Sequence, residues 1–260
     1  MSEEQPVLLT REGDVVRAVL NRPARRNAMN EAMAEALDAL IASLAADASA
    51  RVLVVSGAGG HFCAGLDLGE VAASEEAGDN LARQQERNRR IGARFQALSA
   101  LPQVVVAAVE GSAFAGGLGL VCAADIAIAA PGTRFAAPEV RRGLVPAQIL
   151  PWLVRRMGAA QAARLCLQAD VIGAEEAARI GLVHEVAADL TSRVEAVVAS
   201  VREGAPGALA ETKALIAALG AAAPPGYAQL AAESFGRRAA SPEAAEGIAA
   251  FRERRKPNWV

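Results

Sequence analysis

Residues 101–125 read LPQVVVAAVEGSAFAGGLGLVCAAD and combine two apolar runs with a cluster of glycines. The first run, Val104 to Val109, is short and continuous, which is typical of a buried strand. Gly111, Gly116, Gly117 and Gly119 follow it, inside the second run. Glycines at such a junction let the backbone approach another group closely, although a plain packing turn would use them too.

A helix that begins near Gly116 would direct unpaired N–H groups, and the positive end of its dipole, at the space in front of it. Such groups can bind an anion, or stabilise a carbonyl oxygen that gains negative charge in an oxyanion hole. Short glycine patterns are common, so this segment alone leaves both interpretations open, a site and a packing turn.

The composition excludes several classes of protein. The chain has 260 residues, of which 53% are hydrophobic, so it can bury a sizeable core as one large domain or one domain with an appendage. A net charge of −2 and 3% aromatic residues argue against binding nucleic acid or an anionic membrane. No uncharged apolar stretch reaches about 18 residues, and the first residues do not resemble a secretory signal, so we expect a cytoplasmic protein.

The cysteine and histidine pattern indicates no metal site. Cys63, Cys122 and Cys166 are widely spaced and no CxxC motif or histidine cluster accompanies them, so we expect buried, reduced thiols. His61 and His184 are the only histidines, and we expect both to be structural or surface residues.

Strands alternate with helices through the first two-thirds of the chain, and helices fill the last third. A hairpin (7–10 and 15–20) precedes a helix that Asn30 caps. Further strands are expected at 51–56, 104–109, 126–129, 133–136 and 182–186, and helices at 159–168, 174–180 and through most of 189–255. Residues 70–100 read as a flexible loop and then a solvated helix, and residues 142–151 as a loop. The pattern predicts an α/β fold with a C-terminal helical region, and the glycine spacing argues against a dinucleotide-binding fold.

Several motifs together resemble one known family. They are LNRPARRNAMN (20–30), GAGGHFCAGLDL (57–68), VEGSAFAGGLGLVCAADIAIAAPGTRFAAPEVRRGLVP (109–146), VIGAEEAARIGLVHEV (171–186) and FRERRKPNW (251–259). The chain resembles the enoyl-CoA hydratase/isomerase (crotonase) superfamily nearly from end to end. The resemblance implies a spiral of ββα units, here residues 1–195, and a C-terminal helical oligomerisation region, here residues 196–260. It also implies a homotrimer or a dimer of trimers.

The resemblance implies that acyl-coenzyme A is the substrate and that no permanently bound cofactor is needed. Two backbone N–H groups hold the thioester oxygen in this family, and the matching positions are Leu66 and Gly116. Polarising a thioester carbonyl in this way makes the neighbouring carbon acidic and stabilises an enolate. The remaining positions that the resemblance assigns to binding the substrate are Arg22, Ala24, Arg25, Ala64, Asp67, Gly117 and, from a neighbouring subunit, Lys256. Asp67 has an alternative role, since its carboxylate could simply hold its own turn.

Family hydratases use two glutamates, and this chain keeps only one of the two positions. Glu139 follows Pro138 where one glutamate is expected, but Gly119 occupies the place of the other. A carboxylate near apolar walls has a raised pKa, which suits proton transfer near neutral pH, although an exposed loop glutamate is the simpler alternative. Gln148 falls in a loop that lines the pocket in the family, and we hypothesise that it positions water while Glu139 transfers the proton.

The order of GGLGL and PEVRRGLVPAQI is similar to the branch that hydrates 3-methylglutaconyl-CoA or isohexenylglutaconyl-CoA, whose substrates carry a second carboxylate. Arg141 and Arg142 follow Glu139 and could pair with that group, or could face solvent. Three functions therefore remain open from the sequence. They are a hydratase of 2-enoyl-CoA esters, an isomerase that moves the double bond with Glu139 alone, and a non-catalytic protein that binds coenzyme A esters.

Overall fold

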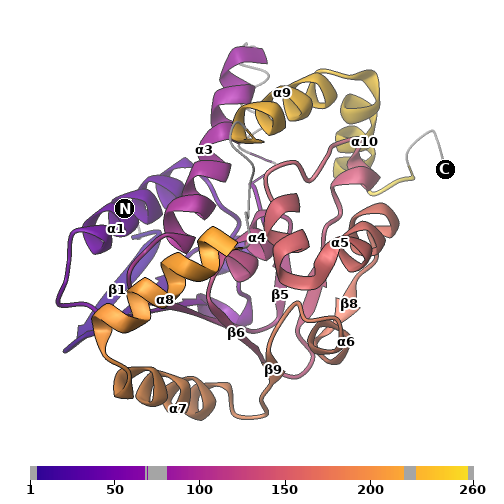
Figure 1. The fold of residues 1–260 in the computed structure, drawn as a ribbon. Coiled ribbons are helices and arrows are strands. Elements are labelled where there is room, and N and C mark those ends of the chain that lie inside the picture. Colours follow the sequence, from indigo (N-terminus) through magenta and orange to yellow (C-terminus); the bar gives the residue numbers. More distant parts are fainter. Residues whose placement is uncertain (1–4, 68, 70–80, 220–226, 257–260) are drawn as a thin grey trace.

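The strands of the computed structural model form two sheets. It describes residues 5–67, 69, 81–219 and 227–256 (Figure 1). The larger sheet has the order β1 (Val7–Glu12), β2 (Val15–Leu20), β3 (Val52–Gly57), β4 (Val104–Val109), β6 (Ile126–Ala129) and β9 (Glu185–Val186). The smaller sheet has the order β5 (Ser112–Phe114), β7 (Arg134–Ala136) and β8 (Ile172–Gly173). β1 and β2 form the expected antiparallel hairpin, and the other neighbours in the larger sheet are parallel.

The chain alternates between the two sheets and then enters a helix. β4 belongs to the large sheet, β5 to the small one, and α4 (Gly116–Ala123) follows, while β6 and β7 repeat the same step. The other helices are α1 (Glu31–Ala45), α3 (Leu81–Ser99), α5 (Leu150–Gln168), α6 (Ala174–Arg179), α7 (Leu190–Glu203), α8 (Pro206–Leu219), α9 (Tyr227–Ala239) and α10 (Pro242–Glu253). This is the predicted α/β arrangement with C-terminal helices. In Figure 1, α9 lies beside the upper part of α3, against which it packs, and α10 lies above α5.

Helices cover both faces of the large sheet. One face packs into the main core with α1, α3, α4 and α5, including the fully buried Phe95, Leu118 and Leu153. The valines of the other face, such as Val52 and Val106, pack against α7. Alternate residues of each strand point to opposite faces, so strands that are apolar throughout are buried on both sides.

The glycine-rich segment forms the elements that the sequence predicts. β4 is buried along its whole length, and α4 begins at Gly116. Arg156 of α5 closes the other end of α4, because its guanidinium donates to the carbonyl oxygens of Val121 at 3.2 Å and Cys122 at 3.1 Å. A cation there satisfies carbonyl groups that the helix itself cannot pair. Arg156 thus fixes the C-terminal end of the segment.

Two expected boundaries are wrong. The helix expected at 159–168 begins already at Leu150. Pro151 does not prevent this, because it lies in the first turn, where proline is tolerated. The backbone leaves the helical conformation at Gly158 and the helix then continues to Gln168. The strand expected at 182–186 is limited to the two residues of β9. Asn30 caps α1 as predicted, accepting from the Met33 N–H at 3.0 Å. The loop expected from residue 70 and the break expected at 224–225 fall outside the described residues.

The three cysteines are free and buried, as expected. Burial raises the pKa of the Cys63 thiol to about 11 and the pKa of Cys122 and Cys166 to about 12. Within the described ranges, the structure holds no group of three or more His, Cys, Asp or Glu side chains arranged for a metal ion. None of the helices in those ranges combines the length and the apolar character that crossing a membrane requires.

Candidate active site

A cavity of about 420 Å³ opens where the glycine-bearing bends meet α3, the segment 139–149 and the C-terminal helices. Arg25, Ala64, Leu66, Asp67, Gly116, Glu139 and Gln148 all line it. The sequence placed these seven residues in one site although they are spread over more than 120 positions, and the fold brings them together.

The two glycine-bearing bends touch each other. Gly65 has a φ of 92°, a conformation that glycine tolerates and other residues rarely adopt. A Cβ atom on Gly65 would lie 2.8 Å from the Ala115 Cβ and 3.4 Å from the Gly116 backbone nitrogen. Side chains do not fit between backbones this close, so only glycine at position 65 allows the two bends to meet.

Both candidate amide groups are left free by their own elements. Met29 donates its N–H to the Gly65 carbonyl at 2.7 Å and accepts from the Asp67 N–H at 3.0 Å. In an extended strand the N–H of the residue between them points to the opposite side, so the Leu66 N–H faces away from Met29. Gly116 is the first residue of α4, where an N–H has no partner within the helix. Two N–H donors that no described residue pairs therefore lie on neighbouring bends at the cavity wall.

Gly117 does not line the cavity. A Cβ atom there would lie 2.4 Å from the Cys63 carbonyl oxygen, so glycine is needed for α4 to pack on the 63–66 bend. The glycine cluster therefore has two roles. Gly117 lets α4 pack closely on the 63–66 bend, and Gly116 lies at the cavity itself.

Glu139 lines the cavity, as Asp67 does, and its Oε2 atom is sealed from solvent. It begins the short helical turn Glu139–Arg142, and among the described residues Oε2 has no hydrogen-bond partner. Burial raises the pKa of Glu139 to about 7, while a backbone N–H and the charge of Arg142 partly oppose the rise. A carboxyl group with this pKa exchanges a proton readily at neutral pH.

The structure separates the two arginines that follow Glu139. Arg141 is exposed and binds Asp170 at 2.5 Å, outside the cavity. Arg142 lines the cavity, is half-buried, and its guanidinium lies 4.5 Å from the centre of the Phe251 ring of α10. No described residue forms a hydrogen bond or ion pair with that guanidinium. Burial lowers the pKa of Arg142, with the Glu139 carboxylate opposing that effect.

The residues expected at the coenzyme A end fall into two groups. Arg25, Ala64 and Asp67 line the cavity mouth, whereas Arg22, Ala24 and Lys256 do not. Arg22 instead pairs with Asp67 at 3.0 Å, and Asp67 also accepts from the Gly69 N–H at 3.1 Å. These contacts favour the structural role for Asp67, which is to hold the bend that carries Leu66.

Gln148 is buried between two helices. Its Nε2 atom donates to the Asn88 side chain of α3 at 2.9 Å and to the Ala228 carbonyl of α9 at 3.2 Å. Both amide hydrogens are therefore used, and only Oε1 remains to accept a hydrogen bond from a water molecule.

The space in front of Gly119 is filled by side chains. A Cβ atom on Gly119 would lie 2.4 Å from Phe95 Cζ and 2.8 Å from Ile149 Cγ2. Any longer side chain would have to displace a buried phenylalanine. No carboxylate at this position is therefore compatible with the core as it is packed.

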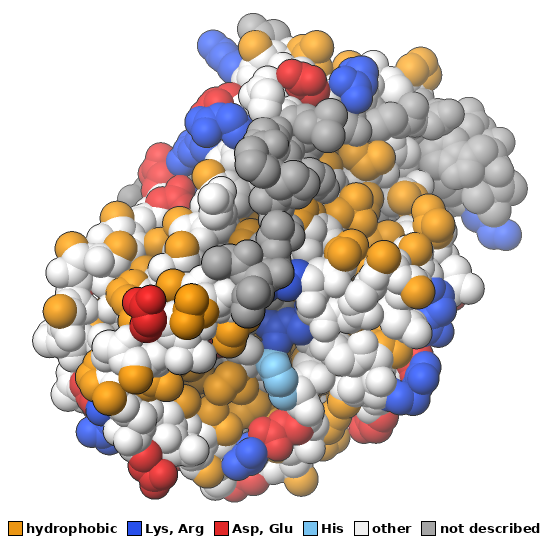
Figure 2. Space-filling model, in the orientation of Figure 1, with side chains coloured by type: hydrophobic (Ala, Val, Ile, Leu, Met, Phe, Trp, Pro, Cys, Tyr) orange, Lys and Arg blue, Asp and Glu red, His pale blue; other side chains and the backbone are white. Residues whose placement is uncertain are grey.

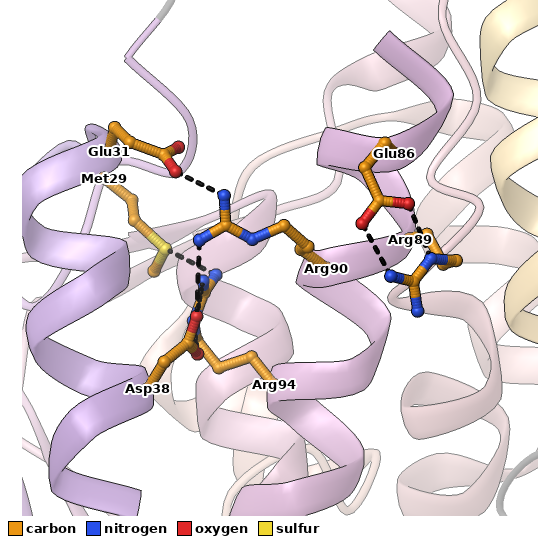
Figure 3. Close-up of polar contacts among 7 residues, drawn as sticks. All are labelled: Met29, Glu31, Asp38, Glu86, Arg89, Arg90 and Arg94. Atoms are coloured by element: carbon orange, nitrogen blue, oxygen red, sulfur yellow. Dashed lines mark hydrogen bonds and ion pairs between the residues drawn. The ribbon is translucent and has the colours of Figure 1, made fainter. Parts of the chain in front are cut away.

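The expectation of a solvated helix for α3 is wrong on one face. Gln84, Asn88 and Phe95 are buried there, and Asn88, Ile91 and Phe95 line the cavity. Ion pairs with α1 hold the other side: Arg94, itself buried, binds Asp38 through two bonds of 2.7 Å and contacts the Met29 sulfur at 3.5 Å (Figure 3). Arg90 reaches Glu31 and Asp38 from one turn earlier. The run of charged residues hid this face, although the spacing of 84, 88, 92 and 95 is helical.

Known proteins resemble this chain over almost its whole length. The sequence profile of the enoyl-CoA hydratase/isomerase family matches residues 10–260. A probable enoyl-CoA hydratase of Rhodobacter capsulatus is 36% identical over 93% of this chain and 92% of its own. The 2,3-dehydroadipyl-CoA hydratase of Escherichia coli is 33% identical over 97% of this chain and 98% of its own.

A solved structure shows the same architecture. The crystal structure of an enoyl-CoA hydratase from Mycobacterium avium superimposes with a TM-score of 0.87 at 34% identity, covering 99% of this chain and 100% of that one. The two-sheet α/β spiral with C-terminal helices is thus the crotonase fold that the motifs indicate. With its fold, its adjoining bends and its sequence in agreement, the chain belongs to the enoyl-CoA hydratase/isomerase family.

Proposed function

We propose that this enzyme catalyses the reversible addition of water to a 2-enoyl-CoA, with Glu139 as the acid–base group and the N–H groups of Leu66 and Gly116 as the oxyanion hole. The carboxylate takes a proton from water, the water oxygen bonds to C3, and negative charge moves to the thioester oxygen between the two amides. Glu139 then returns the proton to C2. The observation that carries this proposal is a buried carboxyl oxygen in a cavity that two backbone N–H donors also line, and none of the three has a hydrogen-bond partner among the described residues.

Gln148 would position the attacking water in this mechanism. Its Oε1 atom accepts a hydrogen bond from the attacking water while its amide hydrogens remain with Asn88 and Ala228. It cannot exchange a proton usefully, so all proton transfer falls to Glu139.

A second function is favoured by one specific observation. Phe95 and Ile149 fill the space that a second carboxylate would need, so Glu139 works without an acidic partner at position 119. One carboxylate is sufficient to remove a proton from C2 of a 3-enoyl-CoA and return it at C4, or to remove it from C4 of a 2-enoyl-CoA and return it at C2 in the reverse direction. The alternative is therefore double-bond isomerisation by Glu139 alone.

Absorbance at the enoyl-thioester band separates the two reactions. With the purified enzyme and a 2-enoyl-CoA, hydration predicts a loss of the band as the conjugated double bond takes up water. With a 3-enoyl-CoA, isomerisation predicts that the band appears. Tight binding of a broad thioester panel without either change would contradict both reactions and support a protein that binds coenzyme A esters without chemistry.

We further propose that the acyl group is of the glutaconyl type and carries a distal carboxylate. Support comes from the resemblance of residues 116–120 and 138–149 to that branch, and from Arg142, a half-buried guanidinium at the cavity with no hydrogen-bonding partner among the described residues. A relative is named for 2,3-dehydroadipyl-CoA. Arg141 is the poorer candidate because Asp170 already neutralises its charge.

Coenzyme A would lie beside Arg25 and Ala64 at the cavity, with its phosphates near the exposed guanidinium of Arg25. In a trimer, or in a dimer of trimers, Lys256 of a neighbouring subunit would add another positive charge. Residues 1–195 would then hold most of the site, and residues 196–260 would make the subunit contacts in addition to completing the cavity wall through Phe235 and Phe251. Sedimentation of the full chain with and without a coenzyme A ester tests this assembly, and a monomer under both conditions would contradict it.

A further inference from the structure

We propose that Phe95 limits the size of the group that the enzyme accepts at C3 of the acyl chain, because its ring occupies the space where a side chain at position 119 would lie. The identity of the bound molecule rests on the proposed function.

The ring and a side chain at position 119 exclude each other. A Cβ atom on Gly119 would lie 2.4 Å and 2.7 Å from two ring carbons of Phe95 and 2.8 Å from Ile149. Cβ atoms in folded proteins do not approach other atoms within 3.0 Å. Phe95 is fully buried and still lines the cavity, so its ring forms part of the wall.

That part of the wall lies beside the reacting carbons. Gly119 is three residues after Gly116, so both are on the same face of α4, about 4.5 Å apart along the helix axis. If the Gly116 amide holds the thioester oxygen, the ring on Gly119 lies next to the carbons that follow the thioester. An apolar wall at this distance discriminates between substituents by their volume.

The ring cannot easily move aside, because both sides of α3 are locked. Its neighbour Arg94 is buried and binds Asp38 of α1 through two 2.7 Å bonds (Figure 3). One turn earlier, Gly92 provides the space for Gln148: a Cβ atom there would lie 2.0 Å from the Gln148 Oε1. Gly119 of α4 thus leaves space for the Phe95 ring, and Gly92 of α3 leaves space for the Gln148 side chain. This packing fixes the width of the cavity.

The first experiment compares thioesters that differ at C3. The ratio of kcat/KM for cinnamoyl-CoA, with a phenyl group at C3, to that for crotonyl-CoA, with a methyl group, is measured for wild type and Phe95→Ala. We expect the ratio to rise about tenfold or more in Phe95→Ala. Leu98→Ala is the matched control, because Leu98 is buried on α3 one turn later but does not line the cavity, and its ratio should equal that of wild type. An unchanged ratio in folded Phe95→Ala would overturn the proposal.

A binding measurement makes the test independent of turnover. The Kd ratio of 3-phenylpropionyl-CoA to butyryl-CoA should fall about tenfold in Phe95→Ala and stay constant in Leu98→Ala. If neither thioester class is turned over but this ratio falls, the proposed function fails and the role of Phe95 stands. If wild type is active and the ratio does not change, only the role of Phe95 fails.

A double-mutant cycle tests the contact itself. Gly119→Ala should lower the melting temperature and the affinity for butyryl-CoA in the wild-type background, and should cost much less in the Phe95→Ala background, where the ring is gone. Equal costs in both backgrounds would show that the two positions do not compete for one space.

Discussion

The two ends of the cavity are built in different ways. At the end that we propose for the thioester, two short bends that adjoin in space present backbone N–H groups. At the acyl end, the wall consists of side chains from α3, the segment 139–149, α9 and α10. The backbone end depends on the local conformation of the chain, whereas the side-chain end depends on how distant segments pack. The first end is suited to a reaction step common to many thioesters, and the second to the choice of substrate.

Charge also differs between the ends. The acyl end holds Glu139 and Arg142 within one helical turn, and among the described residues Arg142 has no hydrogen-bond or ion-pair partner, whereas on the face in Figure 2 charged side chains of both signs are interspersed over the surface. Buried charged groups without such partners are costly, which supports the proposal that they act on a bound molecule.

The largest effect is expected from the one side chain that the chemistry cannot replace. Glu139→Gln keeps the shape of the carboxyl group but cannot accept a proton, so kcat should fall about 10³-fold. Gln148→Ala should lower kcat less, because it removes a group that orients water but transfers no proton. Steady-state kinetics on a 2-enoyl-CoA measure both, and Glu175→Gln, an exposed carboxylate outside the cavity, is the control. Full hydration activity in Glu139→Gln would remove the basis of the mechanism.

The contact between the two bends can be tested with a pair of glycines. Gly65 and Gly60 both have positive φ, but a Cβ atom at Gly65 meets Ala115 at 2.8 Å and one at Gly60 meets nothing within 4 Å. Both alanine variants carry the cost of the backbone conformation, and only Gly65→Ala adds the collision. We expect Gly65→Ala to be less stable than Gly60→Ala by about 1–3 kcal/mol and to lose about 10²-fold in kcat/KM because the amides are displaced. Denaturant unfolding and kinetics measure the two effects, and equal losses in both variants would mean that the bends do not need this contact.

The difference between the backbone end and the side-chain end of the cavity also explains which parts of the fold and the site could be predicted from the sequence. The helix start at Gly116 and most strands follow from local patterns: clustered glycines, short apolar runs and cap residues such as Asn30. Leu66 and Glu139 were assigned by the resemblance to the family. Phe95, Asn88 and Phe251 were not singled out, because nothing local marks a side chain that reaches the cavity from a helix far away in sequence. The pairing of Arg141 with Asp170, which leaves Arg142 for the cavity, depends on the position of a residue 29 positions later. Even the start of α5 was hidden by Pro151, which reads as a loop signal until its place in the first turn is known.

A moderate effect is expected at the arginine of the acyl end. If Arg142 binds a distal carboxylate, Arg142→Gln should raise the KM for a glutaconyl-type CoA ester about tenfold or more, and should leave the KM for a neutral enoyl-CoA of the same length nearly unchanged. Arg141→Gln is the matched control, because it removes the neighbouring charge outside the cavity. Equal increases for both substrates in Arg142→Gln would indicate that the arginine shapes the site without recognising a carboxylate.

The smallest effect is a shift of the pH profile, and it tests whether the two charges of the acyl end act on each other. Glu139 must be ionised to accept a proton from water, and its pKa is raised to about 7, so kcat/KM for a neutral enoyl-CoA should fall about tenfold per pH unit below pH 7 and level off above it. The positive charge of Arg142 lowers that pKa and partly offsets the effect of burial. Removing the charge in Arg142→Gln should therefore move the acid limb to higher pH, whereas Arg141→Gln, whose charge is already paired, should leave it in place. A limb that moves to lower pH, or moves equally in both variants, would show that Arg142 does not act on Glu139 through its charge, and the acyl end would then contain two independent groups.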